Sequence, residues 1–179
     1  HPSGKGFPGQ LGISGDEHLP GLRRLAQAIR DAGSVSSVQL QHSGLRAEAR
    51  PAGQPLVAPF DDAETGARRL STDEVRQVVR DFVAAAVRAE QAGFDGVEIH
   101  GAHGYLLAEF LDADHNHRDD GYGGSAAGRA RIVDEILDGR VDASVDYIID
   151  EPNRMRLRGV EPALLRPIDY GIDFYGDCL

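Results

Sequence analysis

The alternation of helical and strand periodicity is the feature of this sequence that most constrains its fold. The clearest helix begins at a capping box formed by Ser71 and Glu74 and ends at Gly93. A strand is predicted directly after this helix, at 94–100, and another at 34–41. Strands that alternate with helices of this length indicate βαβ units and a parallel sheet. We therefore predict an α/β fold.

A second helix is predicted before the first strand. It has apolar residues at i, i+3, i+4 and i+7, namely Leu22, Leu25, Ala26 and Ile29. Ser14 and Glu17 have the spacing of a capping box at its start, and Gly33 ends it. Residues 43–70 contain three prolines and little periodicity, which predicts a long excursion between the first strand and the capped helix.

Each predicted strand has one apolar and one polar side. The polar side carries Gln39 and Gln41 in the first strand and Glu98 and His100 in the second. A parallel strand that is buried on both faces should be almost wholly apolar. The polar residues therefore indicate a shared pocket, which in α/β folds lies at the carboxyl ends of the strands.

Two histidines and a tyrosine follow the second strand closely, at His100, His103 and Tyr105. One interpretation is a metal site, although a catalytic zinc needs a third protein ligand and the spacing alone is a weak signal. A second is structural, with two hydrogen-bonded histidines and a tyrosine that packs in a helix. In a third, two imidazoles hold a carbonyl oxygen while the phenol donates a proton, and a bound flavin or nicotinamide supplies hydride.

Charge and composition exclude several other functions. The net charge of −10 argues against nucleic acid and anionic membranes as partners. No apolar run approaches the roughly 20 residues of a membrane span. The only cysteine is Cys178, so a disulfide framework or a thiolate metal site is not expected. We expect a cytoplasmic protein that acts on a small molecule.

Three segments resemble one family closely: VQLQHSG at 38–44, GFDGVEIHGAHGYLLAEFL at 93–111 and NHRDDGYGGSAAGRARIVDEIL at 116–137. This order of motifs is similar to that of the Old Yellow Enzyme family of FMN-dependent NAD(P)H:flavin oxidoreductases. The resemblance implies a (β/α)8 TIM barrel that binds FMN at the carboxyl ends of its strands, with NAD(P)H as the reductant.

The resemblance also implies roles for four residues. Gln39 would hydrogen-bond the polar edge of the flavin. His100 and His103 would bind the carbonyl oxygen of an α,β-unsaturated substrate, such as an enone or an enoyl thioester. Tyr105 would be the proton donor, and no metal is expected.

The resemblance covers residues 7–138, so we predict a partial FMN-binding barrel domain at 1–138, holding the third and fourth strands, and an unassigned tail at 139–179. One departure lies after the first strand, where the family usually has arginine; Leu45 takes this place and Arg46 follows. The alternative to an enzyme is a truncated, non-catalytic remnant that binds flavin weakly or not at all. Exposed strand edges would then favour a homo-oligomer.

The YGGS stretch permits two interpretations. A glycine-rich loop can cradle a phosphate. The interpretation we favour is structural: Gly123 and Gly124 form a tight turn, and Ser125 caps the helix that follows.

Overall fold

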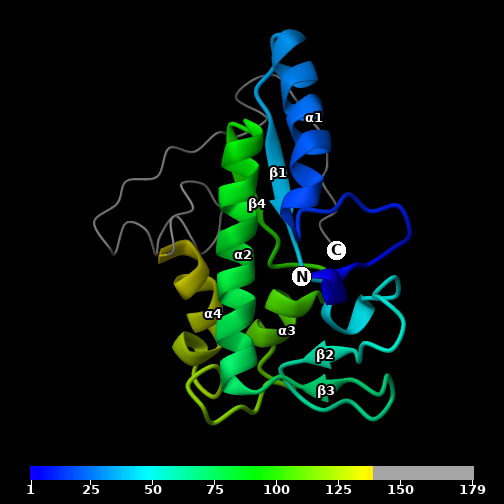
Figure 1. Ribbon diagram of the computed structural model, residues 1–179. Coiled ribbons are helices and arrows are strands. Elements are labelled where there is room, and N and C mark those ends of the chain that lie inside the picture. Colours follow the sequence, from blue (N-terminus) through cyan, green and yellow to red (C-terminus); the bar gives the residue numbers. More distant parts are fainter. Residues whose placement is uncertain (139–179) are drawn as a thin grey trace, which may run out of the picture. The chain divides into compact units, whose positions relative to one another are not determined.

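The computed structural model of the chain describes residues 1–138 and confirms the α/β class (Figure 1). The helices are α1 (Leu19–Asp31), α2 (Thr72–Ala92), α3 (Leu106–Leu111) and α4 (Ala126–Asp138), and the strands are β1 (Ser37–Leu40), β2 (Val57–Ala58), β3 (Arg68–Arg69) and β4 (Gly96–Ile99). The chain divides into the units His1–Val145 and Asp146–Leu179. The predicted tail at 139–179 lies outside the described residues, and the boundary at 138 stays a prediction.

The central sheet pairs β1 with β4 in parallel, as predicted, and the register places like residues side by side. Val38 pairs with Val97 and Leu40 with Ile99, while Gln39 pairs with Glu98. The apolar side packs against α2 in the main core. That core also takes in α3 and α4, through residues that include Val75, Phe82, Leu106, Phe110, Ile132 and Ile136. The other side of the sheet keeps its polar residues together.

Helix α2 has the ends that the sequence predicts. The Ser71 hydroxyl accepts a hydrogen bond from the Glu74 N–H, and the Glu74 carboxylate accepts one from the Ser71 N–H. Gly93 ends the helix in the left-handed conformation, with a φ of 91°, which costs glycine little. Figure 1 shows α2 running alongside both α1 and α4.

The capping box predicted at Ser14 and Glu17 was wrong. Glu17 lies in a single 3-10 turn at Asp16–His18, and α1 begins at Leu19 without a side-chain cap. The reason is Pro20, which lacks an N–H and is tolerated only in the first turn of a helix. The helix therefore begins later than the spacing of Ser14 and Glu17 suggested.

The predicted excursion at 43–70 includes two short strands, β2 and β3, which pair in parallel and were not predicted. One buried guanidinium fixes this segment. Arg118 donates to the carbonyl oxygens of Pro59 at 3.1 Å and Leu70 at 2.6 Å, and its side chain also pairs with Asp120. Asp120 in turn accepts from the Thr72 hydroxyl at the start of α2. We call this set the Arg118 latch.

The YGGS stretch has the geometry of the structural interpretation. Gly124 has a φ of 70°, and a Cβ on Gly123 would lie 2.6 Å from the Arg118 carbonyl oxygen. The Ser125 hydroxyl accepts from the Gly128 N–H at 3.1 Å, which caps α4. None of the helices in the described part of the chain has the length and apolar character that a membrane crossing requires.

Candidate active site

The two central strands end together, because Leu40 pairs with Ile99, the last residue of β4. His100 follows β4 directly, and its N–H donates to the Leu40 carbonyl at 3.0 Å. The rings of His100 and His103 are 4.9 Å apart between centroids, and those of His100 and Tyr105 are 5.2 Å apart. The structure therefore brings the three predicted residues together at the carboxyl edge of the sheet.

A strained turn at His103 and Gly104 brings the rings of His103 and Tyr105 close to His100. His103 has a φ of 58°, and it is the only residue other than glycine with a positive φ in the described part of the chain. Gly104 follows with a φ of 65°. Tyr105 then stands at the N-cap of α3, and its N–H donates to the Ala102 carbonyl at 3.1 Å. Strain of this kind in a residue with a Cβ costs about 1–3 kcal/mol and is concentrated at functional sites.

The electrostatics favour a neutral His100. Its side chain is buried, and this burial, together with the neighbouring His103, lowers the pKa of His100, while Glu98 opposes the shift. A neutral imidazole carries one N–H donor and one acceptor nitrogen. His100 can therefore donate to a carbonyl oxygen without the cost of burying a charge.

Gln39, the predicted flavin contact, lies on the polar side of β1. Its amide nitrogen donates to Glu98 at 2.5 Å, and its side chain is exposed. This bond uses an amide N–H of Gln39, so the amide oxygen, which can only accept hydrogen bonds, is not engaged by Glu98. An acceptor of this kind is what an N–H donor on the polar edge of a flavin ring would need. The sequence shows Glu98 only as a polar position in the strand, and its pairing with Gln39 was not predicted.

A cavity of about 420 Å³ opens beside β1. Gln39, Gln41 and His42 line it, together with residues of the N-terminal segment and of α2. His100, His103 and Tyr105 do not line it. The structure thus places Gln39 at the cavity and the three rings beyond the end of β4.

His42 was not singled out from the sequence. It is buried, and burial lowers its pKa to about 3. One ring nitrogen accepts from the Gly44 N–H at 3.1 Å, and the other lies 3.1 Å from the Ser3 hydroxyl. Its carbonyl oxygen accepts from the Leu106 N–H at 3.0 Å. His42 therefore acts as a neutral brace between the end of β1 and the start of α3.

Glu109 is the second residue that sequence reasoning missed. It is 5% exposed, and its Oε1 accepts from the Leu45 N–H at 2.8 Å, while Oε2 has no hydrogen-bond partner among the described residues. Burial raises the pKa of Glu109 to about 7. It stands one helical turn after Tyr105, and its N–H donates to the Tyr105 carbonyl. An acidic residue in the apolar run LLAEFL was the available signal.

Comparison with known proteins agrees with this geometry. Residues 1–150 match the NADH:flavin oxidoreductase / NADH oxidase family. An NADPH dehydrogenase of Bacillus subtilis (strain 168) is 41% identical over 139 residues, which cover 77% of this chain and 41% of the relative. The chain thus spans about two fifths of the length of this curated relative.

Two solved structures are similar to this chain. Morphinone reductase in complex with tetrahydroNAD has a TM-score of 0.71 and 32% identity, over 78% of this chain and 44% of that one. A 2-naphthoyl-CoA reductase in complex with 2-naphthoyl-CoA has a TM-score of 0.73 and 34% identity, over 78% of this chain and 24% of that one. The match in sequence family, the similar structures and the site geometry point the same way: the chain belongs to the NADH:flavin oxidoreductase / NADH oxidase family, whose cofactor is FMN and whose reductant is NAD(P)H.

Proposed function

We propose that this protein takes part in the FMN-dependent transfer of hydride from NAD(P)H to an activated C=C bond of a small molecule. The convergence of His100, His103 and Tyr105 at the carboxyl edge of the sheet carries this proposal. We call these three residues the carbonyl clamp. The enoyl thioester class is supported by the similarity to an enzyme solved with 2-naphthoyl-CoA, and enones are the simpler members of the same chemistry.

The clamp residues divide the work by their chemistry. The two imidazoles donate to the carbonyl oxygen and so withdraw electron density from the conjugated β-carbon. Bound FMN would supply the hydride that this carbon accepts, after reduction by NAD(P)H. The Tyr105 phenol then gives its proton to the α-carbon. The product is the saturated carbonyl compound, and solvent returns the proton to Tyr105.

Gln39 is the residue of the described part that would hold the flavin, through its amide oxygen, because its amide nitrogen already donates to Glu98. In this proposal β1 and β4 are the third and fourth strands of a (β/α)8 barrel, and the clamp and Gln39 face its carboxyl end. In such a barrel, a flavin contact and a substrate contact can lie at the carboxyl ends of two neighbouring strands. Gln39 in β1 and His100 directly after β4 have this arrangement.

The alternative is a non-catalytic remnant that binds flavin weakly or not at all and associates with other chains. The observation in its favour is that the central sheet has two strands within the described residues. Each strand then has an edge that the described part leaves without a partner, and such edges favour association.

A visible spectrum of the purified chain after incubation with FMN and gel filtration tests the proposal. Flavin absorbance near one equivalent, bleached by NAD(P)H and restored by 2-cyclohexenone, supports the enzyme. A colourless protein after gel filtration would reject the proposed function for this chain and favour the non-catalytic remnant. Light scattering would then measure the self-association of the remnant.

A further inference from the structure

Arg46 lies at the rim of the carbonyl clamp. It ends the 3-10 turn at Gly44–Arg46, which follows β1. A Cβ on Gly104 would lie 3.4 Å from its Nε and 3.5 Å from its Nη2, so the guanidinium rests against this glycine. Gly104 is the residue between His103 and Tyr105. The turn after β1 therefore places the positively charged side chain of Arg46 against the loop that carries two of the three clamp residues.

Within residues 1–138 the Arg46 guanidinium makes no ion pair and no side-chain hydrogen bond, and its side chain is exposed. Arg46 lowers the pKa of the Glu109 carboxyl, but burial outweighs this effect and raises that pKa to about 7, so about half of Glu109 is neutral near neutral pH. The guanidinium thus keeps its donors available for another anion.

Charges of opposite sign lie near the clamp. Glu98 is on β4, two residues and roughly 7 Å along the strand before His100. Its carboxylate accepts a hydrogen bond from the Gln39 amide. Arg46 lies against Gly104, which is in the loop that carries His103 and Tyr105. The chain as a whole has a net charge of −10 and repels anions at long range. A local cation is therefore what would make an anionic substrate acceptable.

We propose that Arg46 makes the site selective for unsaturated carbonyl compounds that carry an anionic group, a carboxylate or a phosphate, on the side of the carbonyl that faces the turn Gly44–Arg46. The guanidinium fork matches the paired oxygens of either group. This inference rests on the proposed function, because Arg46 can bind the anionic group of the substrate only while the clamp holds the carbonyl oxygen.

Two phenols of matched shape test the inference by isothermal titration calorimetry of the purified chain, with and without FMN, at low ionic strength. The phenolic oxygen of 4-hydroxybenzoate or 4-hydroxybenzamide takes the place of the carbonyl oxygen in the clamp, and only the former is anionic opposite it. We expect the wild-type chain to bind the benzoate about fivefold more tightly than the amide, which corresponds to about 1 kcal/mol. Raising the salt concentration should reduce this preference.

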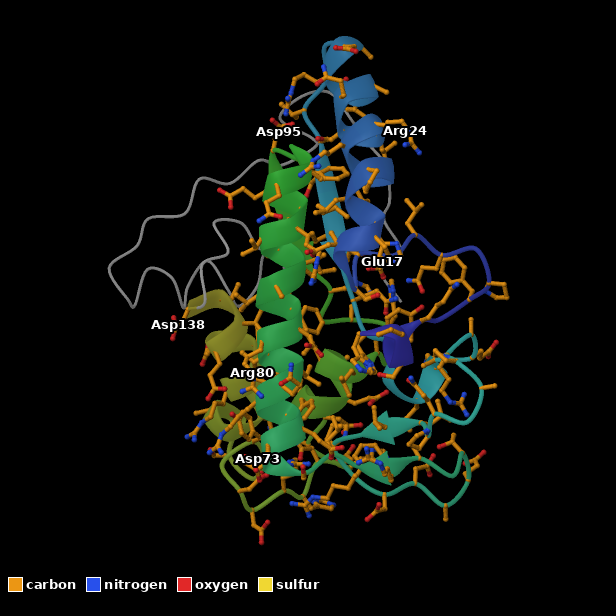
Figure 2. All side chains as sticks on the ribbon, viewed as in Figure 1. Glu17, Arg24, Asp73, Arg80, Asp95 and Asp138 are labelled. Carbon is orange, nitrogen blue, oxygen red and sulfur yellow. The ribbon has the colours of Figure 1, made fainter. Side chains whose placement is uncertain are left out.

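The variants isolate the charge. Arg46→Gln should lose the preference while its affinity for the amide is unchanged, which also shows that the variant is folded, and Arg46→Lys should retain part of it. Arg24→Gln is the matched control, because it removes an exposed arginine of α1 that no described carboxylate pairs with (Figure 2). The control should keep the full preference.

The outcomes separate this inference from the function on which it rests. A preference for the benzoate that survives Arg46→Gln, or that Arg24→Gln removes equally, overturns the role of Arg46 and leaves the clamp intact. Unchanged binding of the amide after joint substitution of His100 and His103 by alanine overturns the clamp, and the inference with it. Binding of neither phenol by the wild-type chain overturns both.

Discussion

Replacing Glu109 by glutamine should change how the stability of this protein depends on pH. The carboxyl is 5% exposed, its Oε1 holds the Leu45 N–H, and Oε2 has no hydrogen-bond partner in the described part. Glutamine has nearly the same shape and keeps an oxygen for the Leu45 N–H, but it does not ionise. The comparison of Glu109 with Glu109→Gln therefore isolates the titration of one buried group.

The expected magnitude follows from the two pKa values. Burial raises the pKa of Glu109 from an ordinary 4.5 to about 7 in the folded chain. The folded state then holds the proton more tightly than the unfolded state, so protonation favours folding. This contribution is fully present below pH 4.5 and is lost as the pH rises to about 7. At 1.36 kcal/mol per pKa unit, the full loss is about 3 kcal/mol.

Urea unfolding at a series of pH values from 4 to 8 measures this effect. Other carboxylates titrate in the same range, so the informative quantity is the difference in unfolding free energy between the wild-type chain and Glu109→Gln. We expect the two to have similar stabilities near pH 4.5 and the variant to be more stable by about 3 kcal/mol at pH 8. Glu48→Gln, which removes an exposed carboxylate from the same excursion, should follow the wild-type curve. Parallel curves for wild type and Glu109→Gln across this range would refute the reasoning.

Three further substitutions test the site and its support. Tyr105→Phe should leave flavin reduction by NAD(P)H nearly intact and slow alkene reduction by about 10²–10⁴-fold in stopped-flow measurements; equal slowing of both half-reactions would indicate a structural role. Joint replacement of His100 and His103 by alanine should weaken the binding of phenols by about 1 kcal/mol or more per lost hydrogen bond. The charge-transfer band between a bound phenol and the flavin measures this affinity, and an unchanged affinity would contradict the clamp. Arg118→Met should cost about 3–5 kcal/mol in urea unfolding, because it leaves Asp120 without its ion-pair partner; a loss below 1 kcal/mol would contradict the Arg118 latch.

Features that depend on residues close along the chain could be predicted from the amino-acid sequence. The capping box at Ser71 and Glu74 and the left-handed Gly93 involve neighbours three or four residues apart, and these interactions form whenever the helix forms. The alternation in 34–41 and 94–100 predicted which sides of β1 and β4 are polar, since strand geometry alternates strictly. The spacing of His100, His103 and Tyr105 predicted a shared site, and a short turn at a strand end brings such residues together.

Features that join distant segments became visible only in the folded chain. Arg118 reaches Pro59 and Leu70, and Glu109 reaches Leu45, across separations of 48 to 64 residues. Nothing in a local pattern shows which carbonyl or N–H will stand opposite a buried arginine or glutamate, and burial sets the pKa of Glu109 only once Leu45 and its neighbours cover it. The position of Arg46 against Gly104 is of the same kind. Local periodicity fixes a helix or a strand, whereas the partner of a buried charge is fixed only when the chain returns on itself, because desolvation and hydrogen bonding act through space.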